Sequence, residues 1–150
     1  MKKILGHAAF VVLSMMFLAG SARADLLASA VRETFATNPS TTVANIALND
    51  AGSTSIGFTT ATAQTVAILF NADCSVDTAG ETLYIVIYVN GTAASGTSVN
   101  VARLCGDTQL EGHSRHVFAS VGAGNHTVTV SAYTTAGTAK IRRSVLLVMN

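Results

Sequence analysis

Apolar residues occupy both faces of the stretch from Thr82 to Gly91, which runs Thr-Leu-Tyr-Ile-Val-Ile-Tyr-Val-Asn-Gly. In a strand, successive side chains point to opposite faces, so this pattern leaves neither face suited to water. The pair Asn90-Gly91 then ends the run with a turn that favours positive φ angles. The pattern predicts a central strand followed by a tight turn, and the rest of the chain is organised around this strand.

Further strand patterns recur along the chain, separated by turns rich in glycine and asparagine. The clearest is His126–Tyr133, where small apolar residues alternate with polar ones, as is typical of an antiparallel strand with one wet face. The segment 25–37 is compatible with a short helix or a strand. The other predicted strands are 42–48, 54–60, 64–72, 98–104, 116–121 and 141–149.

About eight strands with no helix to form parallel crossovers predict an all-β, antiparallel two-sheet β-sandwich. The segments 88–91, 123–130 and 143–148 resemble the C-terminal half of small bacterial secreted jelly-roll domains related in shape to the C1q and tumour-necrosis-factor heads. The resemblance covers about residues 60–149 and rests on strand and turn patterns. It implies a jelly-roll-like sandwich and suggests trimerisation and ligand display.

The first 24 residues have the layout of a secretory signal peptide. Two lysines precede an apolar run from Ala8 to Leu18, which is too short to span a bilayer, and Ala22-Arg23-Ala24 predicts cleavage before Asp25. An uncleaved membrane anchor is the alternative. We expect 1–24 to be a signal peptide and 25–150 to be one β-sandwich domain, secreted or periplasmic, with no membrane anchor after cleavage.

Cleavage at this position changes the charge of the protein. Three of the nine Lys and Arg residues and none of the eight Asp and Glu residues lie in 1–24, so the formal charge goes from +1 to about −2. The main cationic cluster is Lys140, Arg142 and Arg143, which is too small for a nucleic-acid footprint and is typical of a solvated strand edge. We expect no nucleic-acid partner.

Cys74 and Cys105 are the two cysteines of the chain. Both lie in the predicted exported part, and an even pair in an oxidising compartment predicts one disulfide bond. A redox-active pair is usually close in sequence and has a cationic neighbour, whereas this pair is widely separated and Asp73 precedes Cys74. The sequence therefore predicts a structural disulfide.

Polar side chains of the predicted loops 73–81 and 106–115 are the candidate ligand-binding residues. They are Asp73, Asp77, Glu81, Asp107, Glu111 and His113. Together with the loop 92–97, they suit the hydroxyl groups of a carbohydrate at the ends of the sandwich. The acidic residues of 73–81 could also collect oxygen ligands for calcium. They lack the Asp-x-Asp-x-Asp-Gly order of a dedicated calcium loop, however, and turn-forming aspartate is the commoner explanation.

His113 and His116 have a His-x-x-His spacing, which converges on a metal ion in a helix but points to opposite faces of a strand. Gly112 favours a loop position for His113, and nothing in the sequence fixes Asp107 or Glu111 beside it. We therefore expect surface histidines, no metal site and no cofactor. His126 is expected to face solvent at the start of its strand.

No motif in the sequence specifies a reaction. A Gly-x-Ser-x-Gly elbow, a phosphate-binding loop and a carboxylate pair flanked by aromatic residues are absent, and the chain has no tryptophan. We expect that the protein is not an enzyme. Two functions remain: a non-catalytic exported structural or protein-interaction domain that self-associates, and a small carbohydrate- or ligand-binding module that uses the end loops.

Self-association is predicted because the apolar residues exceed what one sandwich core of this size can hold. Two sets of apolar side chains are expected to face away from that core and to need burial by other residues. The first set is Tyr84, Val86 and Tyr88, and the second is Leu146 and Val148. Either the lead-in residues Leu26, Val31 and Phe35 supply this cover, or a partner subunit does. A symmetric homo-oligomer is the commonest form of such a partnership, and the jelly-roll resemblance favours a trimer.

Overall fold

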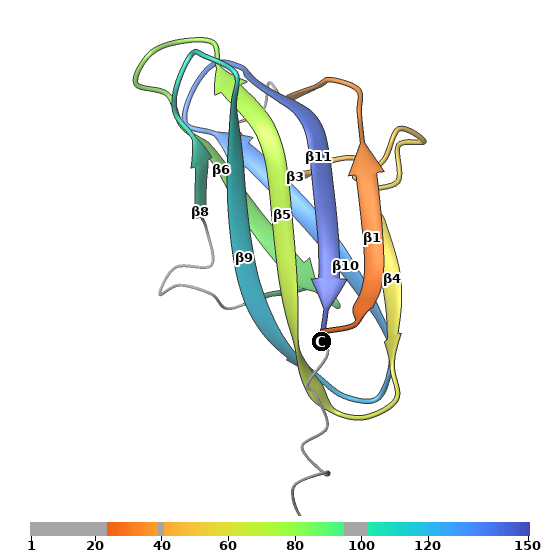
Figure 1. The fold of residues 1–150 in the computed structure, drawn as a ribbon. Helices are drawn as coiled ribbons and strands as arrows, with labels where there is room; N and C mark the ends of the chain where they lie inside the picture. The colour runs from red at the N-terminus through yellow and green to blue at the C-terminus, as the bar shows by residue number, and fades with distance from the viewer. Residues whose placement is uncertain (1–23, 39–40, 95–101) are drawn as a thin grey trace, which may run out of the picture.

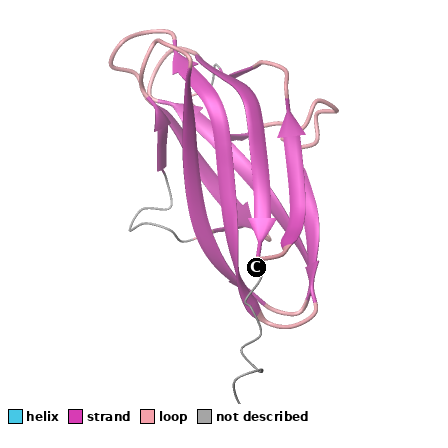
Figure 2. Cartoon of the chain, viewed as in Figure 1, coloured by secondary structure: helices cyan, strands magenta, loops and turns pink. Residues whose placement is uncertain are grey.

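The computed structural model describes residues 24–38, 41–94 and 102–150, so the predicted signal peptide lies outside the described residues except for Ala24. All regular elements in the described residues are strands (Figure 2). They form two antiparallel sheets that pack face to face as a β-sandwich (Figure 1). The predicted all-β sandwich is confirmed. Within these ranges there is no helix of the length and apolarity that crossing a membrane requires.

Eleven strands occur in the described residues. Sheet A contains β1 (Leu26–Arg32), β2 (Ala36–Asn38), β5 (Gln64–Val76), β9 (Glu111–Val121) and β11 (Ala139–Met149). Sheet B contains β3 (Ala44–Asn45), β4 (Ser55–Thr60), β6 (Leu83–Val89), β7 (Thr92–Ala93), β8 (Ala102–Cys105) and β10 (Gly124–Thr134). The segment 25–37, for which the sequence left helix or strand open, contains β1 and the start of β2, with residues 33–35 as the connection.

The strand order shows a jelly roll of eight positions. Sheet A has the order β1-β11-β5-β9, and β2 pairs with β11 beyond the end of β1. In sheet B, β3 and β4 pair with successive parts of β10, and β7 and β8 pair with successive parts of β6. Because the chain changes sheets at each step from β4 to β5, β5 to β6, β8 to β9, β9 to β10 and β10 to β11, the arrangement is that of a jelly roll.

The organising strand predicted over 82–91 is β6, which lies inside sheet B between β10 and the short strands β7 and β8. The inward side chains Leu83, Ile85 and Ile87 belong to the main core, and each is at most 3% exposed. The predicted turn is confirmed by the φ angles of 51° at Asn90 and 78° at Gly91.

Two predicted loops are shorter than expected because their ends belong to long strands. β5 continues from Ala72 to Val76, since it pairs with β11 on one side and with β9 on the other. β9 begins at Glu111, so His113 lies on a strand and not in a loop. The predicted connection 92–97 also contains the short strand β7, while residues 95–97 lie outside the described part.

A β-bulge divides β11 into two halves. Arg142 pairs with Asp73 and Val145 pairs with Asn71, so two residues of β11 oppose the single Ala72 of β5. Arg143, one of these two, has a φ of 45°. Because an extra residue in a strand reverses the alternation of its side chains, the inward residues are odd-numbered before the bulge and even-numbered after it. Ile141, Leu146 and Val148 are accordingly all buried.

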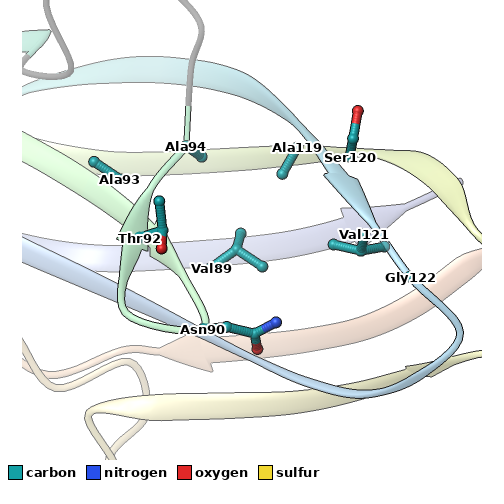
Figure 3. Close-up of a pocket in the computed structure, with 9 residues that line it drawn as sticks. All are labelled: Val89, Asn90, Thr92, Ala93, Ala94, Ala119, Ser120, Val121 and Gly122. Atoms are coloured by element: carbon teal, nitrogen blue, oxygen red, sulfur yellow. The ribbon is translucent and has the colours of Figure 1, made fainter.

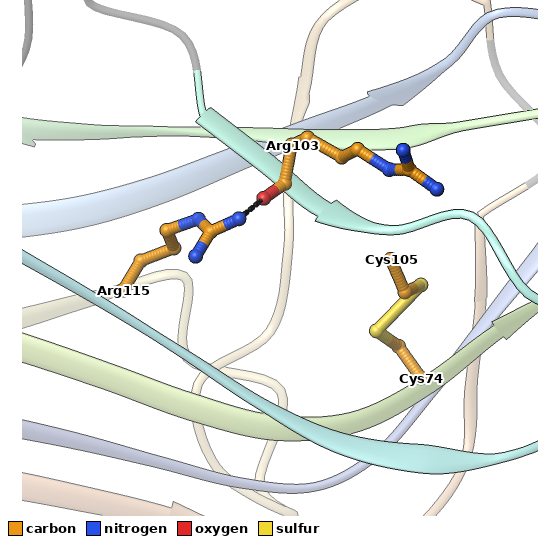
Figure 4. The surroundings of a disulfide bond; sticks show 4 residues. All are labelled: Cys74, Arg103, Cys105 and Arg115. Carbon is orange, nitrogen blue, oxygen red and sulfur yellow. Dashed lines mark hydrogen bonds between the residues drawn. A yellow bond between two sulfur atoms is a disulfide. The ribbon is translucent and has the colours of Figure 1, made fainter.

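Cys74 of β5 and Cys105 of β8 form the predicted disulfide bond (Figure 4). The bond joins sheet A to sheet B, and the two Cα atoms lie 6.2 Å apart. A second contact between the sheets lies beside it, where the guanidinium of Arg115 on β9 donates a hydrogen bond to the carbonyl of Arg103 on β8 (Figure 4). The disulfide therefore fixes the end of β8 against the C-terminal part of β5, an inner strand of the opposite sheet.

His126 is buried, contrary to the expectation that it faces solvent. It is 8% exposed, and its ring centroid lies 5.0 Å from that of Phe58 on the inner face of sheet B. Nδ1 lies 2.9 Å from Nδ2 of Asn90, and Nε2 lies 3.0 Å from the carbonyl of Gly122 and 3.1 Å from Oγ1 of Thr60. A polar ring can be buried here because both nitrogens have partners.

Candidate functional sites

The loop after β8 and the turn after β5 enclose a cleft at one end of the sandwich. Its volume is about 370 Å³. Its lining residues are Ala79, Gly80, Gly106, Asp107, Thr108, Gln109 and Glu111. The start of the loop 106–110 is held in place, because the disulfide fixes Cys105 and the amide of Val76 donates a 2.9 Å hydrogen bond to the carbonyl of Asp107. This end cleft has oxygen-rich walls on a fixed backbone.

Three of the six predicted ligand-binding residues meet beside the end cleft. Asp107, Glu111 and His113 each offer one donor atom, and these atoms all lie within 4.8 Å of one another. Glu111 and His113 extend from the same face of β9, where they pair with Cys74 and Ala72 of β5. The carboxylates are exposed, and the imidazole is half-buried.

The other three predicted residues have separate positions. Asp73 forms a 3.4 Å ion pair with Arg143 at the bulge, and Asp77 forms a 3.0 Å ion pair with Lys140. The carboxylate of Glu81 lies against Gly137, and its Oε2 atom is buried without a hydrogen-bond partner among the described residues. Asp73, Asp77 and Glu81 were predicted to share one loop, but Asp73 is in β5, and Asp73 and Asp77 pair with different cationic residues.

A second cleft lies at the open edge of the sandwich, between the β6–β7 turn and the end of β9 (Figure 3). Its volume is about 380 Å³. The lining residues are Val89, Asn90, Thr92, Ala93, Ala94, Ala119, Ser120, Val121 and Gly122. Thr92 and Ala93 thus line a cleft different from that of Asp107, so the loops predicted to share a binding region are divided between two sites. The lining side chains of this edge cleft are small and uncharged, so they offer few groups for catalysis or for binding a charged ligand.

The outer face of sheet A carries a large uncharged surface, which sequence patterns alone did not place. Three rows of paired residues cross the strands β1, β11, β5 and β9 in that order. The rows are Val31–Val145–Asn71–Ser114, Ser29–Leu147–Leu69–His116 and Leu26–Met149–Ala67–Phe118. We call these twelve residues the uncharged face. Eight of them are apolar, and none is buried.

The apolar residues expected to need cover are arranged differently from the prediction. Leu146 and Val148 are in the core, and their neighbours Val145, Leu147 and Met149 point outward. Leu26 and Val31 do not cover this surface, because β1 joins the edge of the sheet and adds them to the uncharged face. They remain 60% and 49% exposed, and Phe118 on the opposite edge strand is 52% exposed.

The outer face of sheet B is more polar. Tyr84 stacks on Tyr133 of β10 with ring centroids 5.1 Å apart, and both rings are half-buried. Val86 is covered to within 4% exposure, beside the buried Ser131 that pairs with it. Tyr84 and Val86 of this strand are therefore at least half-buried, whereas the exposed apolar residues Leu26, Val31 and Phe118 are on sheet A.

No family model matches the chain, and no curated protein matches it. Among solved structures, the VP2 subviral particle of infectious bursal disease virus is similar with a TM-score of 0.51 and 13% identity, over 86% of this chain and 33% of that one. A family 35 carbohydrate-binding module from an environmental isolate has a TM-score of 0.44 and 14% identity, over 83% and 87% of the two chains. A second such module, from Clostridium thermocellum, has a TM-score of 0.41 and 12% identity, over 79% and 97%.

These similarities concern the fold. The chain spans about a third of the VP2 chain. At 13% identity, the likeness to VP2 shows the fold alone, a jelly-roll β-sandwich, in agreement with the strand order. The finer resemblance to C1q and tumour-necrosis-factor heads stays a prediction.

Proposed function

We propose that this protein is an exported, non-catalytic interaction domain that binds a second copy of itself through the uncharged face. The observation that carries the proposal is the three-row surface on sheet A, which has eight apolar residues and no charged side chain. Contiguous exposed apolar surface on a soluble domain is typical of an interaction site. The disulfide supports an oxidising compartment, either the periplasm or the outside of the cell.

The size of the face indicates how strong the association should be. Four strands at a spacing of about 4.8 Å and three rows about 6.7 Å apart give a surface of about 19 by 20 Å, or close to 400 Å². A standard stable interface needs about 800 Å² from each partner. The uncharged face can therefore form the apolar centre of an interface, and a polar rim must contribute the remainder. We expect association in the micromolar range.

A second copy of the chain is the occupant that the chemistry of this face favours. The surface has no charge with which to select an oppositely charged partner. Its four polar members include both hydrogen-bond donors and acceptors, and they are Ser29, Asn71, Ser114 and His116. In a two-fold pair both subunits use the same patch, so an uncharged face can pack against its own copy without charge repulsion. The trimer implied by the jelly-roll resemblance is the alternative assembly.

Light scattering after size exclusion tests the proposal on the mature chain 25–150. We expect mass to increase from monomer towards dimer as concentration rises to several hundred micromolar. Phe118→Glu and Val31→Glu place a charge on opposite edges of the uncharged face and should give monomers. Leu110→Glu is the matched control, because Leu110 is a 40% exposed leucine outside this face.

Each outcome of this experiment has a defined meaning. A wild-type chain that stays monomeric at several hundred micromolar refutes self-association. A trimeric mass would support the resemblance over the two-fold pair. If only the chain that retains residues 1–24 is monomeric, the apolar run 8–18 covers the face before cleavage, and the mature chain still binds a second copy. Intact mass of the exported protein shows whether its first residue is Asp25, as predicted.

The end cleft favours a second candidate function, the binding of a small carbohydrate. The carboxylates of Asp107 and Glu111 with the side chains of Thr108 and Gln109 offer several hydrogen-bonding groups on one wall. Electrophoresis in gels that contain soluble polysaccharides measures such binding. Retardation by a polysaccharide should be lost in Asp107→Asn/Glu111→Gln and kept in Asp77→Asn. Equal retardation of all three proteins, or none in the wild type, would contradict this candidate.

A further inference from the structure

The cluster of Asp107, Glu111 and His113 has the composition of a metal site. A ring nitrogen and two carboxylate oxygens lie within 4.8 Å of one another. Neither carboxylate takes part in an ion pair among the described residues, since the ion pairs found there involve Asp73 and Asp77. Two unneutralised carboxylates so close together repel each other, and a cation between them removes this repulsion.

His113 supplies a second and independent observation. Its Nε2 atom is buried and has no hydrogen-bond partner among the described residues. Buried imidazole nitrogens nearly always have a partner, because an unpaired one loses its hydration without replacement. His116, three residues further along β9, is exposed and packs edge-on against Phe118 on the opposite face. The unsatisfied histidine is therefore the one that lies beside the two carboxylates.

The backbone that carries the three side chains is fixed. Glu111 and His113 are held by the pairing of β9 with β5, and Asp107 is two residues after the disulfide-bonded Cys105. The backbone carbonyl of Asp107 accepts the hydrogen bond from the amide of Val76. The exposed carboxylates can rotate, whereas the half-buried imidazole has less freedom. Binding an ion would require movement of two side chains and no rearrangement of strands.

We propose that Asp107, Glu111 and His113 bind a divalent first-row transition-metal ion, with Zn²⁺ the expected occupant. One imidazole and two carboxylates suit such borderline ions, whereas Ca²⁺ takes oxygen ligands alone. Donor atoms around a tetrahedral Zn²⁺ lie about 3.3 Å apart, so the present spacing must close by at most about 1.5 Å. Three protein ligands leave a coordination position open, and the end cleft adjoins it.

This site is independent of self-association, and it also does not require that the end cleft bind a carbohydrate. Isothermal titration of the chelator-treated mature chain with ZnCl₂, MnCl₂ and CaCl₂ measures it directly. We expect one Zn²⁺ per chain, weaker binding of Mn²⁺ and little of Ca²⁺. The thermal unfolding temperature should rise with Zn²⁺, because a ligand that binds the folded state alone stabilises it.

Variants separate this site from other histidines. His113→Ala and Glu111→Gln should each weaken Zn²⁺ binding about tenfold or more, while His116→Ala should bind as the wild type does. Circular dichroism shows that each variant is folded. If His113→Ala does not fold, the exposed Glu111 provides the decisive variant. Equal affinity in wild type and Glu111→Gln, loss of binding in His116→Ala, or no Zn²⁺ binding at 100 µM total metal would overturn the proposal.

Discussion

Replacing Asn90 tests whether the buried histidine is held by the turn after β6. Asn90 has a φ of 51°, a left-handed conformation that asparagine tolerates better than most residues. Its Oδ1 accepts a 3.0 Å hydrogen bond from the amide of Thr127, which fixes the amide group so that Nδ2 faces Nδ1 of His126 at 2.9 Å. Nδ1 must then accept, and the ring proton is on Nε2, where it faces the carbonyl of Gly122.

The structure gives different magnitudes for two substitutions. Alanine at position 90 lacks the side-chain amide that lets asparagine tolerate the left-handed conformation, and this costs about 1 kcal/mol. It also leaves Nδ1 of the 8% exposed His126 without a partner, which costs about 1 to 3 kcal/mol. Asn90→Gly loses the same hydrogen bonds but has no left-handed penalty. We expect a loss of about 3 kcal/mol for the alanine variant and about 2 kcal/mol for the glycine variant.

Urea unfolding of the mature chain, followed by far-ultraviolet circular dichroism at pH 7, measures both values. Asn125→Ala is the matched control, because Asn125 is an exposed asparagine next to His126. Its Oδ1 atom accepts a hydrogen bond from the hydroxyl of Thr59 and has no contact with the His126 ring among those found in the described residues. It should cost less than about 1 kcal/mol. The reasoning is refuted if Asn90→Gly is within 0.5 kcal/mol of the wild type, since the hydrogen bond to His126 would then contribute little.

Two further stability predictions concern the disulfide and the carboxyl group of Asp50. Replacing Cys74 and Cys105 by alanine opens a link that spans 31 residues and should cost roughly 3 to 4 kcal/mol in urea unfolding; a loss below 1 kcal/mol would contradict this. Hydrogen bonds from the hydroxyl and the amide of Thr34 lower the pKa of Asp50. Asp50 therefore stabilises the fold above its ordinary pKa near 3.8, and this is lost as pH falls through the lower folded value. Asp50→Asn should lose less stability than the wild type between pH 5 and pH 2.5.

Short-range patterns in the sequence were sufficient for the class of fold. The alternation over 126–133 and the two-faced apolar stretch 83–89 predict strands because side chains in a strand alternate between faces. Asn90-Gly91 predicts its turn because both residues accept positive φ. The disulfide followed from the cysteine count and the predicted export, since the two cysteines have only each other as partners. None of these inferences depends on how distant strands are paired.

The bulge at Arg143 shows what the sequence could not determine. Val145, Leu147 and Met149 are as apolar as Leu146 and Val148, so either set suits the core. The extra residue between Arg142 and Val145 reverses the alternation and puts the even-numbered set inside. Which residues form the uncharged face was therefore decided by the pairing of β11 with β5.

The candidate sites depend on tertiary structure for the same reason. The sequence named six ligand-binding residues, yet only the register of β9 on β5 and the anchoring of the loop after Cys105 bring Asp107, Glu111 and His113 together. His126 resembles a surface residue in sequence, because the partners that allow its burial come from distant parts of the chain. Local periodicity determines which segments are strands, whereas the contacts between strands far apart in sequence determine which side chains meet.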